Sequence, residues 1–478
     1  MISVPHDAAV VALGVLAGFR QEFYGCLTRR ADALFELCDA ILCADGPVVS
    51  LPELSLSAVH RRGHGALYGA LSSGRVEIAR LQAALTGLDL PRRHGQLAIA
   101  VDVTAWPRPD AQCSPGRSHC HRACRCDGDR QTIPGWPYSV AAALGTGRRS
   151  WTAPLDILRI DPDGDVTEAT AGQIRALLDR LAAAGQHRPG DPPVLIVLDA
   201  GYDIVRLTWL LRDLPVHLLG RIRCNRVMHR PAPARRQGAR GPAPRHGHRF
   251  AFTDPATWPA ADQATTNDSD RYGSVYARAW SRLHPVLQGR GAWEQHPGLL
   301  PVIEATIILV VVDRLPGNHT PDPLWLWSSH PEPPTAAGLD LMWWTYLRRF
   351  DLEHTFRFFK QTLGFTRPRV RTPYQADRWA WLIIAAYTQL RLARGLTIDL
   401  RRPWEKPLAR ERMTPGRVRR GFPHLRRKAG NPARVPRFSR PGPGRPTGSL
   451  SGPAPRHPVG KKHTKPDTPK RVRTKQQG

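Results

Sequence analysis

Three acidic residues stand where carboxylates could serve catalysis or hold a metal ion. Asp102 lies near the end of an apolar, β-forming stretch at residues 97–103, and Asp199 directly follows the apolar stretch 194–198. Ligands of open α/β sheets gather at the carboxyl ends of the strands, so both aspartates are candidates for one site. Taken singly, each aspartate is more often a turn or helix-capping residue. The pair therefore needs a third, more specific element.

That element is a polar stripe within residues 346–360. On a helix of about 100° per residue, four polar side chains fall on a stripe about 60° wide: Tyr346, Arg349, Glu353 and Lys360. Large apolar side chains flank the stripe on both sides: Trp343, Leu347, Phe350, Phe356, Phe358 and Leu363. A solvated helix face would not be bounded in this way, so the stripe is predicted to line a groove. The alternative is an Arg349–Glu353 pair on a surface helix, which contributes little to stability.

Carboxylates from two strands and one helix suit Mg²⁺, which prefers oxygen ligands together with substrate phosphate. Two such ions about 3.5–4 Å apart can activate an attacking oxygen and stabilise a leaving oxygen on phosphorus. We therefore predict that Asp102, Asp199 and Glu353 are metal ligands. The basic and aromatic side chains of the stripe would hold a phosphodiester by charge, hydrogen bonding or packing.

The rest of the sequence indicates how these side chains are positioned. Residues 1–94 have helical periodicity with basic pairs near helix ends, which suits either a small DNA-binding domain or an ordinary helical cap. Residues 95–224 alternate apolar strands with helices, as an α/β sheet requires. Residues 225–338 read as mostly β, and residues 339–400 return to helix. Residues 401–478 are basic and rich in proline, so we predict that they are disordered.

The net charge of +29 points to nucleic acid as a partner, with an acidic membrane surface second. Residues 401–478 hold 23 Lys and Arg against three Asp and Glu, and so carry +20 of this excess. The most apolar run, residues 305–312, is well short of the ~20 residues that cross a bilayer. The apolar stretch 8–19 lacks the preceding basic residues of a signal peptide. A cytoplasmic, nucleoid-associated protein is expected.

The stripe and the two aspartates together resemble a known family. The spacing Tyr-x2-Arg-x3-Glu-x6-Lys within residues 346–360 is similar to the Tyr-Arg-Glu-Lys signature of bacterial insertion-sequence DDE transposases, in the cut-and-paste branch with a β insertion. Asp102 and Asp199 match the first and second acidic positions of that family. The resemblance covers roughly residues 95–395.

The resemblance implies an α/β fold. Its ribonuclease-H-like catalytic core would be interrupted by a mostly β insertion and flanked by an N-terminal helical domain and a disordered basic C-terminal tail. The implied ligands of two Mg²⁺ ions, with Mn²⁺ as a substitute, are Asp102, Asp199 and Glu353. The implied DNA contacts are Tyr346, Arg349 and Lys360.

The resemblance also implies a reaction and its partners. The reaction is excision and integration of an insertion sequence by phosphodiester hydrolysis and strand transfer. The implied partner is double-stranded DNA, both the terminal inverted repeats of the element and the target. A homodimer is expected in the DNA complex.

Two other functions stay open beside this one. A related metal-dependent nuclease would hydrolyse DNA without joining it, and an inactive transposase-derived protein would only bind DNA. The three intact carboxylates argue against the second.

Two further features of the sequence have alternative interpretations. The cysteines and histidines within residues 113–126 could hold Zn²⁺, but their Cys-x3-Cys-x-Cys spacing fits no common zinc module, and a reduced, arginine-rich loop is the better interpretation. The resemblance also implies a tryptophan in the insertion that assists a flipped base during cleavage, for which Trp325 and Trp327 are candidates by location alone. A pair of strand aromatics in a core is the simpler interpretation.

Overall fold

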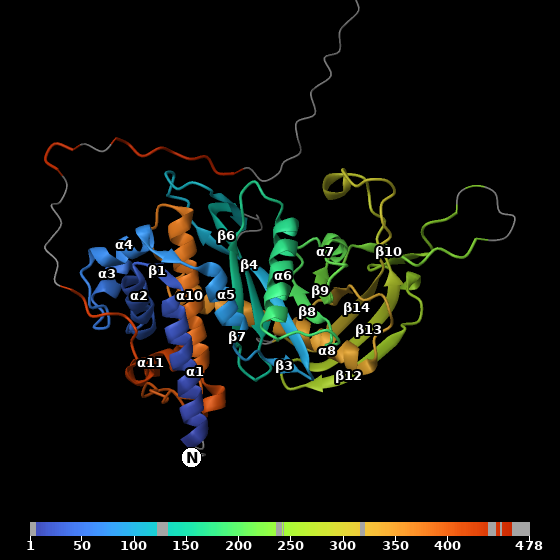
Figure 1. The fold of residues 1–478 in the computed structure, drawn as a ribbon. Helices are drawn as coiled ribbons and strands as arrows, with labels where there is room; N and C mark the ends of the chain where they lie inside the picture. Colours follow the sequence, from blue (N-terminus) through green and yellow to red (C-terminus); the bar gives the residue numbers. More distant parts are fainter. Residues whose placement is uncertain are drawn as a thin grey trace, which may run out of the picture.

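The computed structural model describes residues 6–121, 132–235, 241, 243–315, 321–437, 446–449 and 452–460. Within these residues, eleven strands form one large mixed sheet (Figure 1). Along its path the strands follow the order β12 (Gln263–Ser269), β13 (Gly273–Leu283), β14 (Ala305–Val312), β15 (Leu324–Ser328), β9 (Val216–Ile222), β8 (Val194–Leu198), β4 (Gln96–Pro107), β6 (Thr132–Leu144) and β5 (Ser118–His121). Two strands attach beside this path: β3 (Arg92–Arg93) pairs with β4, and β7 (Thr152–Arg159) pairs with β6.

Three parallel strands lie in the middle of the sheet. β8 pairs in parallel with both β4 and β9, and all five of its residues are buried. This burial follows from cover on both faces, which gives parallel strands their continuous apolar runs. α6 (Val166–Ala183) and α7 (Ile204–Leu210) cover one face, where Ile174 and Leu177 share a core with Ile196 of β8. The predicted mixed α/β class is confirmed.

The opposite face packs against helices from both ends of the chain. α8 (Ala336–Arg348), α9 (Phe350–Gln361) and α10 (Pro373–Ala393) share its core with the N-terminal elements. Those elements are α1 (His6–Gly25), β1 (Leu27–Arg29), α2 (Ala31–Cys43), α3 (Leu51–Ser55), α4 (Gly65–Ser73), β2 (Arg75–Val76) and α5 (Ile78–Thr86). The buried side chain of Arg20 in α1 donates to Asp39 of α2 at 2.8 Å and to Gln389 of α10 at 2.5 Å. Helices from the two ends of the chain are therefore joined by a buried network of hydrogen bonds.

The C-terminal segment corrects one prediction. After the turn η3 (Arg410–Arg412), α11 (Pro415–Ala429) buries Val418, Phe422 and Leu425 in the core shared with α1, α2 and α10. The expectation of disorder is therefore wrong for this stretch. Residues 452–460 also lie against the body of the protein, because Gly460 N–H donates to the Arg117 carbonyl at 2.7 Å.

The strands within residues 225–338 extend the central sheet. β15 pairs with β9 in antiparallel fashion, and β14, β13 and β12 follow outwards (Figure 1). A separate two-stranded sheet, β10 (Val227–His229) with β11 (Arg249–Ala251), and the turns η1 (Pro255–Thr257) and η2 (Gly291–Trp293) complete the region. The Trp325 ring stacks on Phe252 with centroids 4.2 Å apart, and Trp327 is fully buried. Both tryptophans are core residues, as the simpler interpretation held.

None of the helices in the described part of the chain is long and apolar enough to cross a membrane.

Candidate active site

Strand register brings the two aspartates side by side. Val101 of β4 pairs in parallel with Leu198 of β8, so the next residue of each strand is an aspartate, Asp102 and Asp199. β8 ends there, as predicted, but β4 continues to Pro107 because its far half pairs with β6. Asp102 therefore lies within its strand and not near the end. Asp102 nevertheless lines the same cavity as Asp199 and Tyr202 of the turn that follows β8.

The third carboxylate comes from the junction of α8 and α9. The stripe was expected on a single helix, and the structure divides it into two helices that meet at Arg349. The backbone at Arg349 stays helical, with φ −50° and ψ −33°, and its N–H donates to the Tyr346 carbonyl at 3.0 Å. The junction is a tightened helical turn, so the residues of the stripe keep nearly helical spacing across it. Tyr346, Arg349 and Glu353 consequently stay on one side.

Arg349 gathers the three carboxylates. Its Nη1 donates to Asp102 Oδ2 at 2.9 Å, and its Nη2 donates to Glu353 Oε1 at 2.9 Å. Nη2 also lies 3.7 Å from Asp199 Oδ1. The side chains of Asp199 and Glu353 are about 40% exposed, whereas those of Asp102 and Arg349 are largely buried. The site is therefore a partly open acidic cluster held around one cation, and the alternative of an isolated surface pair does not describe it.

Burial and mutual repulsion disfavour the charge on Asp102. Removal from water is the main cause that raises the pKa of Asp102 to about 6, and the nearby negative charges of Asp199 and Glu353 contribute to the rise. Arg349 opposes this rise by attracting the ionised form. In a cluster of three acids and one guanidinium, additional positive charge would be stabilising. This excess of negative charge is the feature that fits a divalent cation.

The other stripe residues differ in their exposure. Tyr346 is buried with its ring centroid 5.9 Å from the Arg349 guanidinium carbon, and burial raises the pKa of Tyr346 to about 12. Lys360 is half-buried, and burial lowers its pKa while Cys120 and Asp102 oppose that change. Lys360 thus feels the charge of Asp102 without an ion pair to it among the described residues.

A cavity of about 430 Å³ opens over the two aspartates. Tyr202 and Cys120 line it together with Asp102 and Asp199. Burial raises the pKa of Tyr202, with Asp102 adding to the effect. Sequence reasoning missed Tyr202 as a site residue, although it follows Asp199 by three positions within the turn that was expected there. Its hydroxyl stays protonated and can act as a donor at neutral pH.

Metal coordination would require this arrangement to change. Among the described residues, no three His, Cys, Asp or Glu side chains converge closely enough to hold one ion. For the acidic cluster the reason is visible, because the guanidinium lies between the carboxylates. For the suggested zinc cluster, Cys113, His119 and Cys120 do not converge, and Cys124 and Cys126 lie outside the described residues.

Comparison with known proteins identifies the family. A model of the DDE superfamily endonucleases matches residues 22–285, more than half of the chain. The match contains Asp102 and Asp199 and ends before Glu353. No curated protein matches the chain. The acidic cluster and the family match agree on enzymes that cut DNA and that generally use divalent metal ions, and the chain belongs to the DDE superfamily endonucleases.

Proposed function

We propose that this protein is a DNA transposase of the insertion-sequence type, in the cut-and-paste branch with the Tyr-Arg-Glu-Lys signature. It would excise and integrate its element by two successive displacements at phosphorus, first by water and then by the freed 3′-hydroxyl. The observation that carries the proposal is the convergence of Asp102, Asp199 and Glu353 on the Arg349 guanidinium. Residues that lie far apart in the sequence meet in a partly open site at the carboxyl end of the central strand β8.

Asp102, Asp199 and Glu353 would hold two Mg²⁺ ions, or Mn²⁺ in their place. The bound metal would supply an activated water and neutralise charge that develops on phosphorus. Carboxyl groups coordinate metal ions in their ionised form, so Asp102 must lose the proton that burial favours.

The cations of the stripe would bind the phosphodiester. Arg349 is a fork of donors that matches a phosphate as well as a carboxylate, so it can exchange one for the other. Lys360 offers a point charge near Asp102, and the Tyr346 ring lies next to the Arg349 guanidinium. These three residues would orient the scissile phosphate against the acidic cluster.

We further propose a division of labour along the chain. Residues 95–224 and 339–400 would be the two parts of a ribonuclease-H-like core, interrupted by an insertion at residues 225–338. Residues 1–94 would bind the terminal inverted repeats, within a homodimer that pairs two element ends. The exposed Arg29 and Arg30 support this role better than Arg61, whose guanidinium donates to Glu36 and to the Ala433 carbonyl.

Glu353→Gln tests the assignment. With a duplex that carries the inverted repeats flanking the gene, the variant should lose cleavage by at least about 100-fold, since metal stabilisation of the transition state is worth several kcal/mol. Binding of the same duplex, measured by anisotropy, should stay within about twofold, because Glu353 is a metal ligand and not a phosphate contact. The matched control is Glu332→Gln, an exposed acid outside the cluster.

Unchanged cleavage by Glu353→Gln would remove the active-site assignment. Incubation of the wild-type protein with supercoiled target plasmid then distinguishes a transposase from a nuclease that does not join DNA. Joined products identify a transposase, whereas nicked ends without joining identify a nuclease of the same family.

A further inference from the structure

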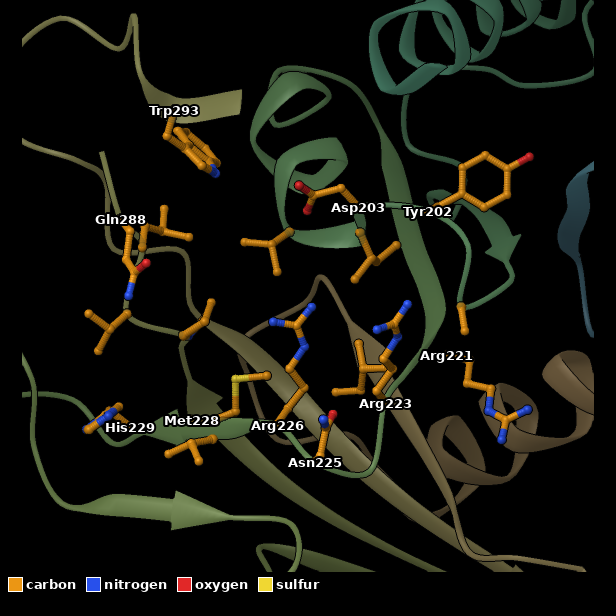
Figure 2. A pocket seen from close by; sticks show the side chains of 18 of the residues that line it. Tyr202, Asp203, Arg221, Arg223, Asn225, Arg226, Met228, His229, Gln288 and Trp293 are labelled. Carbon is orange, nitrogen blue, oxygen red and sulfur yellow. The ribbon is translucent and has the colours of Figure 1, made fainter. Parts of the chain in front are cut away.

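A second hollow, of about 750 Å³, lies on the other side of the turn that follows Asp199 (Figure 2). Its floor is the segment after β9, and its opposite wall comes from residues 285–293. Gly201 and Tyr202 line both this hollow and the cavity over the aspartates. The two spaces are therefore neighbours that share one turn. We name the hollow the arginine groove after its basic lining residues: Arg221, Arg223, Arg226 and Arg290.

The described residues leave the guanidinium groups of the arginine groove without neutralising ion pairs. Arg221, Arg223 and Arg226 are exposed, and none forms an ion pair with a carboxylate in the part of the chain that the structure describes. Figure 2 shows Arg223 and Arg226 extending side by side into the hollow. Of the described lining residues, Asp203 alone is acidic, and its carboxylate accepts the Arg206 N–H at 3.1 Å at the start of α7. Exposed, unpaired guanidinium groups in a concave surface attract polyanions.

The charge also reaches towards the acidic cluster. The positive charge of Arg221 lowers the pKa of Tyr346, against the larger effect of burial. Tyr346 in turn lies beside Arg349. Arg221 therefore belongs to the lining of the groove and also acts on a residue of the stripe. A positively charged groove beside the acidic cluster suits the backbone of a single polynucleotide strand.

An aromatic ring faces the arginines across the hollow. Trp293 is half-buried and makes edge contacts with Trp209 and His296, with ring centroids 6.4 and 5.7 Å away. Figure 2 places its indole on the side opposite Arg223 and Arg226. A supported indole beside cations is the combination that binds unpaired bases by stacking while the phosphates are neutralised. A paired base inside a duplex offers no free face to such a ring.

We propose that the arginine groove binds a single DNA strand adjacent to the cleaved phosphate, with phosphates on Arg223 and Arg226 and a base on Trp293. The proposal deepens the proposed function, on which it rests for the position of the DNA end. The groove would hold the strand that separates from its complement at the site of cleavage. It would thereby select DNA whose ends are frayed or already open.

The test measures binding of a short fluorescein-labelled oligothymidine, and of a blunt duplex of equal length, to the full chain in EDTA. The double variant Arg223→Gln/Arg226→Gln should bind the single strand at least about tenfold more weakly. The slope of log K against log salt should fall by about 1.4, since each phosphate contact of a single strand contributes about 0.7. Duplex affinity should change by less than about twofold. Trp293→Ala should weaken single-strand binding by at least about fivefold without changing the slope.

Two control variants distinguish the effect of the charge of the groove arginines from the effect of their position. Arg223→Lys/Arg226→Lys keeps the charge and should keep the salt slope. Arg148→Gln/Arg175→Gln removes the same charge from two arginines outside the groove, one exposed and one half-buried, and should leave single-strand binding unchanged. Undiminished single-strand binding by the glutamine variant, or an equal loss for strand and duplex, would overturn the proposal.

Failure here is distinguishable from failure of the proposed function. Binding in EDTA does not depend on metal at the carboxylates, and cleavage by Glu353→Gln does not depend on the groove arginines. Retained cleavage by Glu353→Gln would remove the active-site assignment and leave the binding result standing. Loss of cleavage in Glu353→Gln together with unaltered binding in the groove variant would contradict only the proposal for the arginine groove and would leave the active-site assignment standing.

Discussion

Arg349 Nη1 donates to Asp102 Oδ2 at 2.9 Å, although the two residues are 247 positions apart in the chain. The same guanidinium reaches Glu353 through Nη2, four residues further along. One guanidinium from the stripe is therefore shared by three neighbouring carboxylates, whose charge it balances only in part. It also connects the helical part of the site to the sheet.

Replacing Arg349 with glutamine should destabilise the protein in the absence of metal. Asp102 is largely buried and would lose its partner, so the free energy of unfolding should fall by about 3 kcal/mol in EDTA. Added Mn²⁺ should raise the melting temperature of Arg349→Gln more than that of the wild type, because the freed carboxylates can then bind it. Arg148→Gln, which breaks an exposed pair with Asp270, should change stability by less than about 1 kcal/mol. An unaffected melting temperature in both conditions would show that Arg349 is not the counter-ion of the cluster.

Buried histidine should make the protein sensitive to mild acid. His284 is fully buried, and burial together with the positive charge of His246 lowers its pKa to about 4, against the opposing effect of Glu304. The unfolded chain takes up a proton near the ordinary value of 6.5, whereas the folded chain does so only near 4. The corresponding stability is complete above pH 6.5 and lost as the pH falls towards 4, by about 3 kcal/mol.

Urea unfolding at a series of pH values measures this loss. His284→Gln should flatten the decline between pH 6.5 and 4, while His424→Gln at an exposed position should not. Parallel curves for the wild type and His284→Gln would contradict the assignment.

Removal of residues 461–478 should weaken DNA binding without affecting the fold. This segment holds seven Lys and Arg against one Asp, and it follows the last residue that the structure describes. Each duplex phosphate that the segment neutralises adds about 0.9 to the salt slope, so the slope of the shortened chain should be smaller. The free energy of unfolding should stay the same. A salt slope identical to that of the full chain would rule out phosphate binding by this segment.

Phe422→Ala should show that α11 belongs to the core. The ring is fully buried, so the substitution should cost about 3–5 kcal/mol of the free energy of unfolding. His424→Ala, two residues away and exposed, should cost less than about 0.5 kcal/mol. Equal stability of the two variants would mean that α11 does not pack in solution.

The sequence revealed the parts of the fold whose side chains report burial directly. β8 reads as five apolar residues because both its faces are covered, and α6 shows its periodicity because one side meets the sheet. β12 lies within the region predicted as mostly β but shows no apolar strand pattern of its own, since the segment Gln263–Ser269 lies at the edge of the sheet and carries mostly polar side chains. Edge strands need little apolar surface, so they leave little signal.

α11 has a helical pattern of apolar residues in the sequence, although its composition led to the prediction of disorder. Val418, Phe422, Leu425 and Ala429 repeat at helical spacing, and all four are buried. The surrounding arginines and Pro423 suggested disorder instead. The reason is physical: Arg419 is itself buried, where it donates to the Ile41 carbonyl at 2.9 Å. Charge density does not distinguish a solvated arginine from one that ties a helix to its neighbour.

The site was predictable in composition and only partly in geometry. Spacing placed Arg349 beside Glu353, and the ends of apolar runs located both aspartates. The contact between Arg349 and Asp102 depends on the packing of α9 against β4, which no local pattern encodes. The arginine groove likewise forms between two segments that are separate in the sequence. The positions of Arg223 and Arg226 do not indicate that residues 285–293 form the opposite wall.

The shared core of the first and last helices has a consequence for synthesis. Arg20 and Asp39 emerge early from the ribosome, but Gln389 and Arg426, which bind them, are made near the end. The N-terminal helices cannot bury their ion pair until almost the whole chain has been translated, because contacts of such long sequence separation form late. A translation product that stops before α10 and α11 therefore leaves Arg20 and Asp39 without these partners. The buried contacts that join the two ends of the chain can therefore form only after the C-terminal helices have been made.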